Sequence, residues 1–352
     1  MSLDPRLDPE IAAALAAGPP RPTLLDRLSR AGLAELRAAR AESDATRPVE
    51  GVRVRDHRLP GPEALRVRIY RPEADAPVPV PCLVWFHGGG MVLGTPEADD
   101  ARVSAYARDV GCVVVSVEYR LAPEHPHPVP VEDCYRALRW TAGRARALGI
   151  DPHRLAVGGI SAGGGGAPPP PPAGGGGGAP PPAPPAPARR ARAPGGGPPP
   201  PPPTALLARD RGGPALAFQL LLCPMLDDRN TTPSSREFSR AVAWPRADNL
   251  FGWSALLGPL AGTEAVPPYA APARAADLSG LPAAYVDVGE LEVFRDECAR
   301  YALRLAEAGV PAEFRLWPGA FHGFDGALPR VALSRRAAAE QVAVLRRALG
   351  GR

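Results

Sequence analysis

Six short apolar runs constrain the fold of this chain more than any other feature. Most are separated by stretches in which apolar residues recur with the period of a helix, as at 131–148, 295–308 and 330–349. Strands that are apolar on both faces and alternate with helices are typical of a parallel sheet covered by helices on both sides. The sequence therefore predicts an α/β fold. The six runs lie at 82–86, 112–117, 155–157, 216–222, 284–288 and 312–316.

The regions outside this alternation predict accessory structure. Residues 1–48 have a helical pattern, and alternating runs at 52–55 and 65–70 predict two half-exposed antiparallel strands. Residues 227–268 follow no regular alternation and contain Trp244 and Trp253. A chain of 352 residues has room for one large α/β domain with such accessory segments.

Composition and charge argue against several classes of partner. The net charge is only +4, and the 41 basic residues, all arginine, are mixed with acidic ones rather than gathered as a nucleic-acid surface requires. No apolar stretch approaches the roughly 20 residues that span a bilayer. The N-terminus lacks the basic and apolar regions of a secretory signal. We therefore expect a cytoplasmic protein with neither a membrane span nor a nucleic-acid partner.

The cysteines are five in number and scattered, and no pair has metal-ligand or redox spacing. We expect them to be small buried apolar side chains in a reducing compartment, and we expect no bound metal. They are Cys82, Cys112, Cys134, Cys223 and Cys298.

Three motifs that follow predicted strands indicate serine hydrolase chemistry. They are His-Gly-Gly-Gly at 87–90, Gly-Ile-Ser-Ala-Gly at 159–163 and Phe-His-Gly-Phe at 321–324. A serine hydroxyl is a weak nucleophile that needs a base, a carboxylate to orient the base, and N–H donors for the developing oxyanion. Small residues around Ser161 suit a sharp strand-to-helix turn that exposes the hydroxyl.

The low-complexity tract at 164–203 contains only Gly, Pro, Ala and Arg, in homopolymer blocks. Proline removes backbone donors and glycine disfavours helices, so the tract cannot form a regular helix or a paired strand. Residues 204–210 have the pattern of the last turns of a helix, so the tract is predicted to interrupt a helix that begins at Ser161. Either the tract loops out of two packed helical pieces, or it displaces the helix and impairs activity. A third alternative is an artefact in the sequence itself, which the intact mass of the purified protein would reveal.

Apart from this tract, nearly the whole chain resembles the bacterial hormone-sensitive-lipase-like carboxylesterases of the α/β-hydrolase fold. The resemblance implies hydrolysis of short- to medium-chain acyl esters through an acyl-enzyme intermediate, with no cofactor. It also implies a catalytic domain over 49–352 and a helical cap formed by 1–48 and 227–268. The motifs that carry it lie at 87–90, 118–126, 159–163, 292–297 and 322–324.

The resemblance also implies a role for each site residue. Ser161 is the expected nucleophile, and His322 is the general base and then the acid. Glu292 is the expected acidic partner, where the family more often has Asp. The expected oxyanion-hole donors are the N–H groups of Gly88, Gly89 and Ala162.

Two features leave alternatives open. Ile160 stands where the family usually has an acidic residue, and the helix after the serine is broken. The acidic partner could also be sought at Asp287, Glu290, Asp296 or Glu297. The same scaffold could serve a catalytically impaired small-ligand-binding protein, or an amidase or deacetylase with the same triad. The resemblance further suggests a homodimer.

Overall fold

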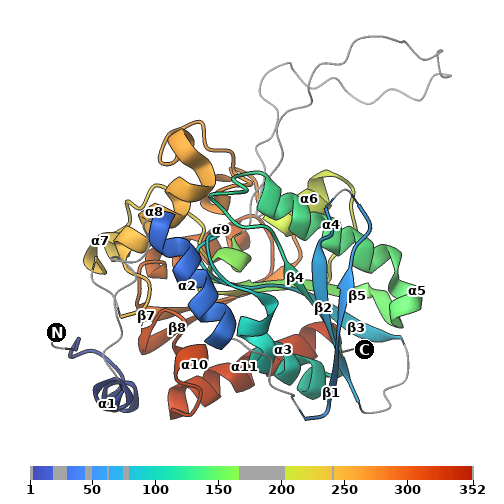
Figure 1. Cartoon of the computed structure of the whole chain (residues 1–352), viewed down its shortest axis with the longest axis horizontal. Coiled ribbons are helices and arrows are strands. Elements are labelled where there is room, and N and C mark those ends of the chain that lie inside the picture. Colours follow the sequence, from blue (N-terminus) through green and yellow to red (C-terminus); the bar gives the residue numbers. More distant parts are fainter. Residues whose placement is uncertain are drawn as a thin grey trace, which may run out of the picture.

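The structure, a computed structural model, describes residues 3–18, 30–43, 50–61, 63–73, 79–165, 203–239 and 242–350. Most of the low-complexity tract lies outside these residues. The centre of the described part is an eight-stranded sheet with the order β1-β2-β4-β3-β5-β6-β7-β8 (Figure 1). Its strands are β1 Val52–Arg58, β2 Arg66–Pro72, β3 Val80–Phe86, β4 Val113–Glu118, β5 Ile150–Ile160, β6 Phe218–Leu222, β7 Ala283–Leu291 and β8 Ala312–Phe321.

The sheet is parallel from β4 to β8, with an antiparallel edge. The strand β2 pairs antiparallel with both β1 and β4, and all other pairs are parallel. Each of the six apolar runs lies wholly or mostly within a strand of the parallel part, and the two alternating runs fall in β1 and β2. The predicted fold class is confirmed.

Alternate residues of the strands pack into two separate cores. In β3, Leu83 and Trp85 join the core beneath α3 and α11, whereas Val84 and Phe86 join the larger core on the opposite face. Both faces are therefore covered, which explains why these strands are continuously apolar. The helices are α3 Asp100–Tyr106 and α11 Ala332–Leu349 on one face, and α4 Val129–Gly143, α6 Pro203–Asp210 and α9 Arg295–Glu307 on the other (Figure 1).

One predicted helix, 131–148, is two helices in the structure. The first, α4, ends at Gly143, and α5 spans Ala145–Leu148. The reason is local: Arg144 between them leaves the helical region, with φ −107° and ψ 13°. The chain therefore turns at this residue before it enters β5.

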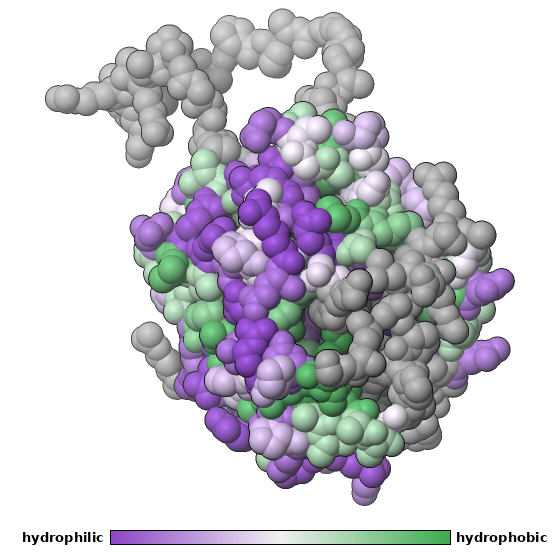
Figure 2. All heavy atoms as spheres, turned by 90° about the vertical axis from the view of Figure 1, so that its left-hand side faces the viewer, coloured by the Kyte–Doolittle hydropathy of each residue, from purple (hydrophilic) through white to green (hydrophobic). Residues whose placement is uncertain are grey.

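The accessory segments also contain helices. Within residues 1–48 the structure describes α1 Pro9–Ala17 and α2 Arg30–Ser43, and within 227–268 it describes α7 Pro233–Glu237 and α8 Arg246–Leu257. Hydrophilic side chains gather on the face of the molecule where α1 and α7 lie (Figures 1 and 2). Ion pairs of 2.7 Å and 3.3 Å join Glu237 to Arg6 and to Arg295, so they tie the N-terminal segment to α7 and α9.

Candidate active site

Three side chains from distant parts of the chain meet at the carboxyl edge of the sheet. Ser161 follows β5, Glu292 follows β7 and His322 follows β8. The distance from His322 Nε2 to Ser161 Oγ is 3.1 Å, and that from His322 Nδ1 to Glu292 Oε2 is 2.5 Å. An alcohol, an imidazole and a carboxylate thus form one continuous hydrogen-bonded chain.

The backbone at Ser161 is held in an unusual conformation. Its φ is 55°, a left-handed value that costs a residue with a side chain about 1–3 kcal/mol. Glycines make the turn possible, since a Cβ atom at Gly159 would lie 2.5 Å from the carbonyl oxygen of Gly163. A Cβ at Gly163 would lie 2.1 Å from the carbonyl oxygen of Phe86. The turn is therefore a tight strand-to-helix elbow, as the motif predicts.

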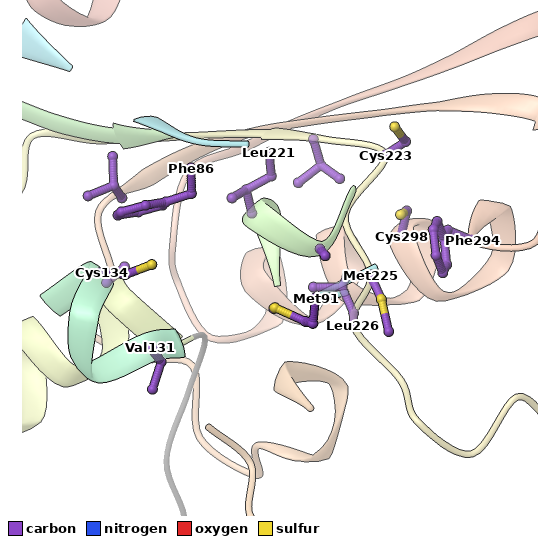
Figure 3. Packing of buried hydrophobic residues seen from close by; sticks show 14 of the residues in the cluster. Phe86, Met91, Val131, Cys134, Leu221, Cys223, Met225, Leu226, Phe294 and Cys298 are labelled. Atoms are coloured by element: carbon purple, nitrogen blue, oxygen red, sulfur yellow. The ribbon is translucent and has the colours of Figure 1, made fainter. Parts of the chain in front are cut away.

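A single 3-10 turn, Ser161–Gly164, follows the serine where a longer helix is expected of the family. The N–H of Gly165 donates to the carbonyl of Ala162 at 2.9 Å, and the Ser161 carbonyl accepts from the N–H of Met225 at 3.0 Å. Figure 3 shows Met225 and other apolar side chains beside this turn. Helical structure resumes in α6 at Pro203, close to the predicted position.

Glu292 is held in place by its own loop. Its side chain is fully buried, and Oε1 accepts a hydrogen bond of 3.0 Å from the N–H of Gly289, which leaves Oε2 facing the imidazole. The alternative carboxylates have other partners. Glu290 accepts from the N–H of Gly319 at 2.8 Å, and Asp296 accepts from the N–H of Ser234 at 2.8 Å.

Two further alternatives, Asp287 and Glu297, are buried away from the imidazole. Asp287 accepts hydrogen bonds from Trp317 Nε1 at 3.4 Å and from Gln341 Nε2 at 3.2 Å. Burial raises the pKa of Asp287 to about 7. Glu297 accepts from two backbone N–H groups of the β6–α7 loop. Only Glu292, among the described carboxylates, contacts His322.

The loop after β3 lies directly beside the serine. A Cβ atom built on Gly88 would lie 3.5 Å from Ser161 Cβ, which is ordinary van der Waals contact. The Gly88 backbone therefore lies directly beside the nucleophile. Gly89 has φ 126°, and its carbonyl accepts from the N–H groups of Val92 and Leu93. Within the described part of the chain, the N–H groups of Gly88 and Gly89 donate no hydrogen bond to the protein. They are therefore available to a ligand oxygen.

His87 supports this loop from below. Its buried ring stacks on Tyr119 with centroids 4.2 Å apart, and its Nδ1 lies 2.9 Å from the carbonyl oxygen of Gly88. The Tyr119 hydroxyl donates to the His87 carbonyl at 2.7 Å. Burial lowers the pKa of His87 to about 4, so this imidazole is neutral at physiological pH.

Sequence reasoning assigned no role to two of the neighbours of the site. Tyr119 clamps the loop after β3 as described, and the Phe294 ring meets the His322 ring edge-on at 5.2 Å. Both lie inside motifs that carry the family resemblance, so the signal was their position in those motifs rather than their chemistry.

One group of described residues could hold a metal ion. Ligand atoms of Cys223, Glu292 and His322 lie within 4.8 Å of one another. The group fits a metal poorly, because burial raises the pKa of the Cys223 thiol well above its usual value and the other two side chains already bond each other. All five cysteines are free and buried.

The chain is similar to several known proteins. It matches the family described as alpha/beta hydrolase fold over residues 83–167 and 203–326. It is 35% identical to carboxylesterase NlhH of Mycobacterium tuberculosis, over 77% of this chain and 74% of that protein. Esterase LipI of the same organism is 34% identical, over 78% of this chain and 76% of its own length. A solved structure titled bacterial heroin esterase superposes with a TM-score of 0.81 at 37% identity, covering 99% of both chains.

These matches, together with the fold and the site, show that the chain belongs to the α/β-hydrolase fold family, among its hormone-sensitive-lipase-like carboxylesterases. The predicted family is confirmed. The family match leaves out residues 168–202, which fall in the low-complexity tract. No helix in the described part of the chain is long and apolar enough to cross a membrane.

Proposed function

We propose that this chain is a serine carboxylesterase that hydrolyses short- to medium-chain acyl esters through an acyl-enzyme intermediate. The observation that carries the proposal is the continuous contact from Ser161 Oγ through the His322 ring to the Glu292 carboxylate, at 3.1 Å and 2.5 Å. The names of its relatives, a carboxylesterase and two esterases, favour ester hydrolysis over ligand binding alone.

In the acylation step, Ser161 Oγ attacks the carbonyl carbon of the ester while His322 Nε2 takes the hydroxyl proton. The Glu292 carboxylate accepts a hydrogen bond from Nδ1–H, so it fixes the ring orientation and stabilises the imidazolium that forms. The negative charge moves to the former carbonyl oxygen. The backbone N–H groups of Gly88, Gly89 and Ala162 are the proposed donors to that oxyanion.

The tetrahedral intermediate then breaks its carbon–oxygen bond to the alcohol. His322 returns its proton to the leaving oxygen, and an acyl group remains on Ser161. A water molecule enters, loses a proton to the same nitrogen and attacks the acyl carbon. The bond from the acyl carbon to Ser161 Oγ then breaks, Oγ takes the proton back from His322, and the carboxylic acid leaves. No step calls for a cofactor.

The accessory segments are proposed to form a cap over this site. The α2 helix of the N-terminal segment and the α8 helix of residues 227–268 both contact the loop that follows β3. Arg37 Nε of α2 donates to the Val92 carbonyl at 2.9 Å, and a Cβ at Gly252 of α8 would lie 2.7 Å from the Gly90 carbonyl oxygen. The catalytic domain of residues 49–352, a cytoplasmic location and a homodimer also remain parts of this proposal.

The nucleophile assignment is tested with Ser161→Ala and the buried control Ser116→Ala, whose hydroxyl has no partner among the described residues. Loss of Ser161 is expected to lower kcat on a p-nitrophenyl ester by roughly 10⁴-fold or more and to abolish labelling by a fluorophosphonate. The Ser116 variant should retain both. Hydrolysis at the wild-type rate by Ser161→Ala would overturn the proposed mechanism.

A further inference from the structure

Asp248 is a buried carboxylate that the mechanism above does not use. Its side chain lies in the first turn of α8, and the residue is 1% exposed. Neither carboxylate oxygen has a hydrogen-bond partner among the described residues. Burial raises the pKa of this carboxyl to about 7, and no cation forms an ion pair with it among the residues that the structure describes.

This arrangement is unusual for an acidic residue at a helix start. Such residues are favourable there because their oxygens face the helix N–H groups or water. The oxygens of Asp248 do neither. Buried carboxylates in proteins are as a rule paired or hydrogen-bonded, so a partner that is not part of the described chain is called for.

The helix face of α8 that carries Asp248 packs on the loop that holds the proposed oxyanion donors. Gly252, four residues later and thus on the same helix face, packs so closely that its Cβ would lie 2.7 Å from the carbonyl oxygen of Gly90. Gly90 directly follows Gly88 and Gly89, the proposed oxyanion donors. Asp248 lies four residues, about 6 Å along the helix axis, before Gly252. The Trp244 indole lies against the same loop, since a Cβ at Gly90 would be 2.2 Å from its ring.

We propose that Asp248 forms a substrate subsite for a protonated amine, so that the enzyme prefers esters that carry an ammonium group. This inference rests on the proposed esterase function and deepens it by naming the substrate class. A protonated amine supplies both the positive charge and the N–H donor that the buried carboxylate lacks. An uncharged apolar group of the same shape supplies neither, and it would leave the carboxylate unpaired.

Two pairs of esters, each matched in shape, test this subsite. The first pair is 2-(dimethylamino)ethyl acetate and 3-methylbutyl acetate, which place the amine or its carbon analogue on the alcohol. The second is methyl 4-(dimethylamino)butanoate and methyl 5-methylhexanoate, which place it on the acyl chain. Amine esters differ from their carbon analogues in intrinsic reactivity. For each pair, the kcat/KM of the amine ester is therefore divided by the kcat/KM of the carbon analogue, and this ratio in each variant is divided by the ratio in wild type.

Asp248→Asn is expected to lower that ratio by roughly tenfold to a hundredfold for at least one pair, as befits loss of a charged hydrogen bond. The rate on the uncharged ester should stay close to wild type. Asp248→Leu should show the same loss, and it guards against an asparagine variant that folds poorly. Asp277→Asn, which removes a partly exposed carboxylate, controls for net charge and should leave the ratio unchanged.

Unchanged ratios for both pairs in folded Asp248 variants would overturn the subsite while leaving the esterase function intact. Folding is verified by thermal unfolding and by fluorophosphonate labelling of Ser161. A wild-type protein that hydrolyses none of the four esters and resists labelling would instead contradict the proposed function, and the subsite with it.

Discussion

Gly163 has so little free space around it that one methyl group would collide with two carbonyl oxygens. A Cβ there would lie 2.1 Å from the oxygen of Phe86 and 2.5 Å from that of His87. Both oxygens belong to the segment that carries the loop after β3, so the collision would push that loop away from Ser161. The elbow and the proposed oxyanion donors are thus coupled through a single residue.

Gly163→Ala is expected to destabilise the fold by about 1–3 kcal/mol, the usual effect of overpacking, and to reduce kcat on short acyl esters. Gly143→Ala is a matched control, because a Cβ at that helical glycine meets nothing within 4 Å among the described residues. Chemical denaturation and ester hydrolysis measure the two effects. Equal stability of the two variants would contradict this account of the elbow.

At this scale the sequence was most informative where a motif demands a particular backbone. The glycines around Ser161 and the glycine after His322 identified the nucleophile and the base as candidates. The acidic partner was harder, because Glu290 and Glu292 are close in sequence and chemically alike. What distinguishes them is the contact of Glu292 with His322, which lies thirty residues later in the chain, a tertiary detail that no local pattern encodes.

Among the elements, α2 contacts the catalytic domain through its buried Leu33 and Leu36 and through Arg37. Besides the Val92 carbonyl, Arg37 donates to the Ala122 carbonyl at 2.8 Å and forms two hydrogen bonds with the Glu124 carboxylate. The Ala122 N–H in turn donates to the Met91 carbonyl at 2.9 Å. One guanidinium therefore joins the proposed cap to the loop after β3 and to the segment after β4.

Arg37→Met is expected to cost about 1–3 kcal/mol of stability, because two partly buried carbonyl groups lose a charged donor. It should also raise KM for esters, since the loop after β3, which lies beside Ser161, loses a hydrogen bond that holds it in place. Glu124→Gln keeps both carbonyl contacts and removes only an exposed ion pair, so it should cost less than about 1 kcal/mol. If the two variants had equal stability and equal KM, Arg37 would act only through the ion pair.

The elements themselves were predicted well where hydrophobic pattern decides them. All six apolar runs form strands of the parallel part of the sheet, where both faces are covered and apolar side chains on either face are buried. The pattern did not predict α3, Asp100–Tyr106, whose seven residues are too few to show a clear period. Nor did it predict the interruption at Arg144, since a change of backbone angles at one residue leaves the apolar spacing intact.

For the molecule as a whole, Asp287 links the sheet to the helices on one face. It bonds Gln341 of α11, which also accepts from Arg102 of α3 and donates to Asp325. Burial and the nearby Asp325 charge raise the pKa of Asp287 to about 7, and hydrogen bonds from Gln341 and Trp317 together with the Arg102 charge only partly oppose this. In the unfolded chain an aspartate titrates near about 3.9.

Between those two pH values the unfolded chain has released a proton that the folded protein keeps, so this group makes the free energy of unfolding fall as pH rises. Asp287→Asn removes the titration. The free energy of unfolding of the variant, minus that of wild type, is expected to rise by about 2–3 kcal/mol from pH 5 to pH 8. Urea denaturation at both pH values measures the gain. A difference that does not change with pH would show that Asp287 titrates normally.

The catalytic groups lie in two described stretches of the chain. One ends with the turn Ser161–Gly164, and the other begins with α6 at Pro203. The first brings the nucleophile and the glycine loop, and the second brings the carboxylate and the imidazole. Within the described residues, parallel pairing of β5 with β6 and packing of α6 on α4 hold the two stretches together through non-covalent contacts. The hydrolase is thus organised as two complementary halves, and reassembly from separately made polypeptides would be read out directly as ester turnover.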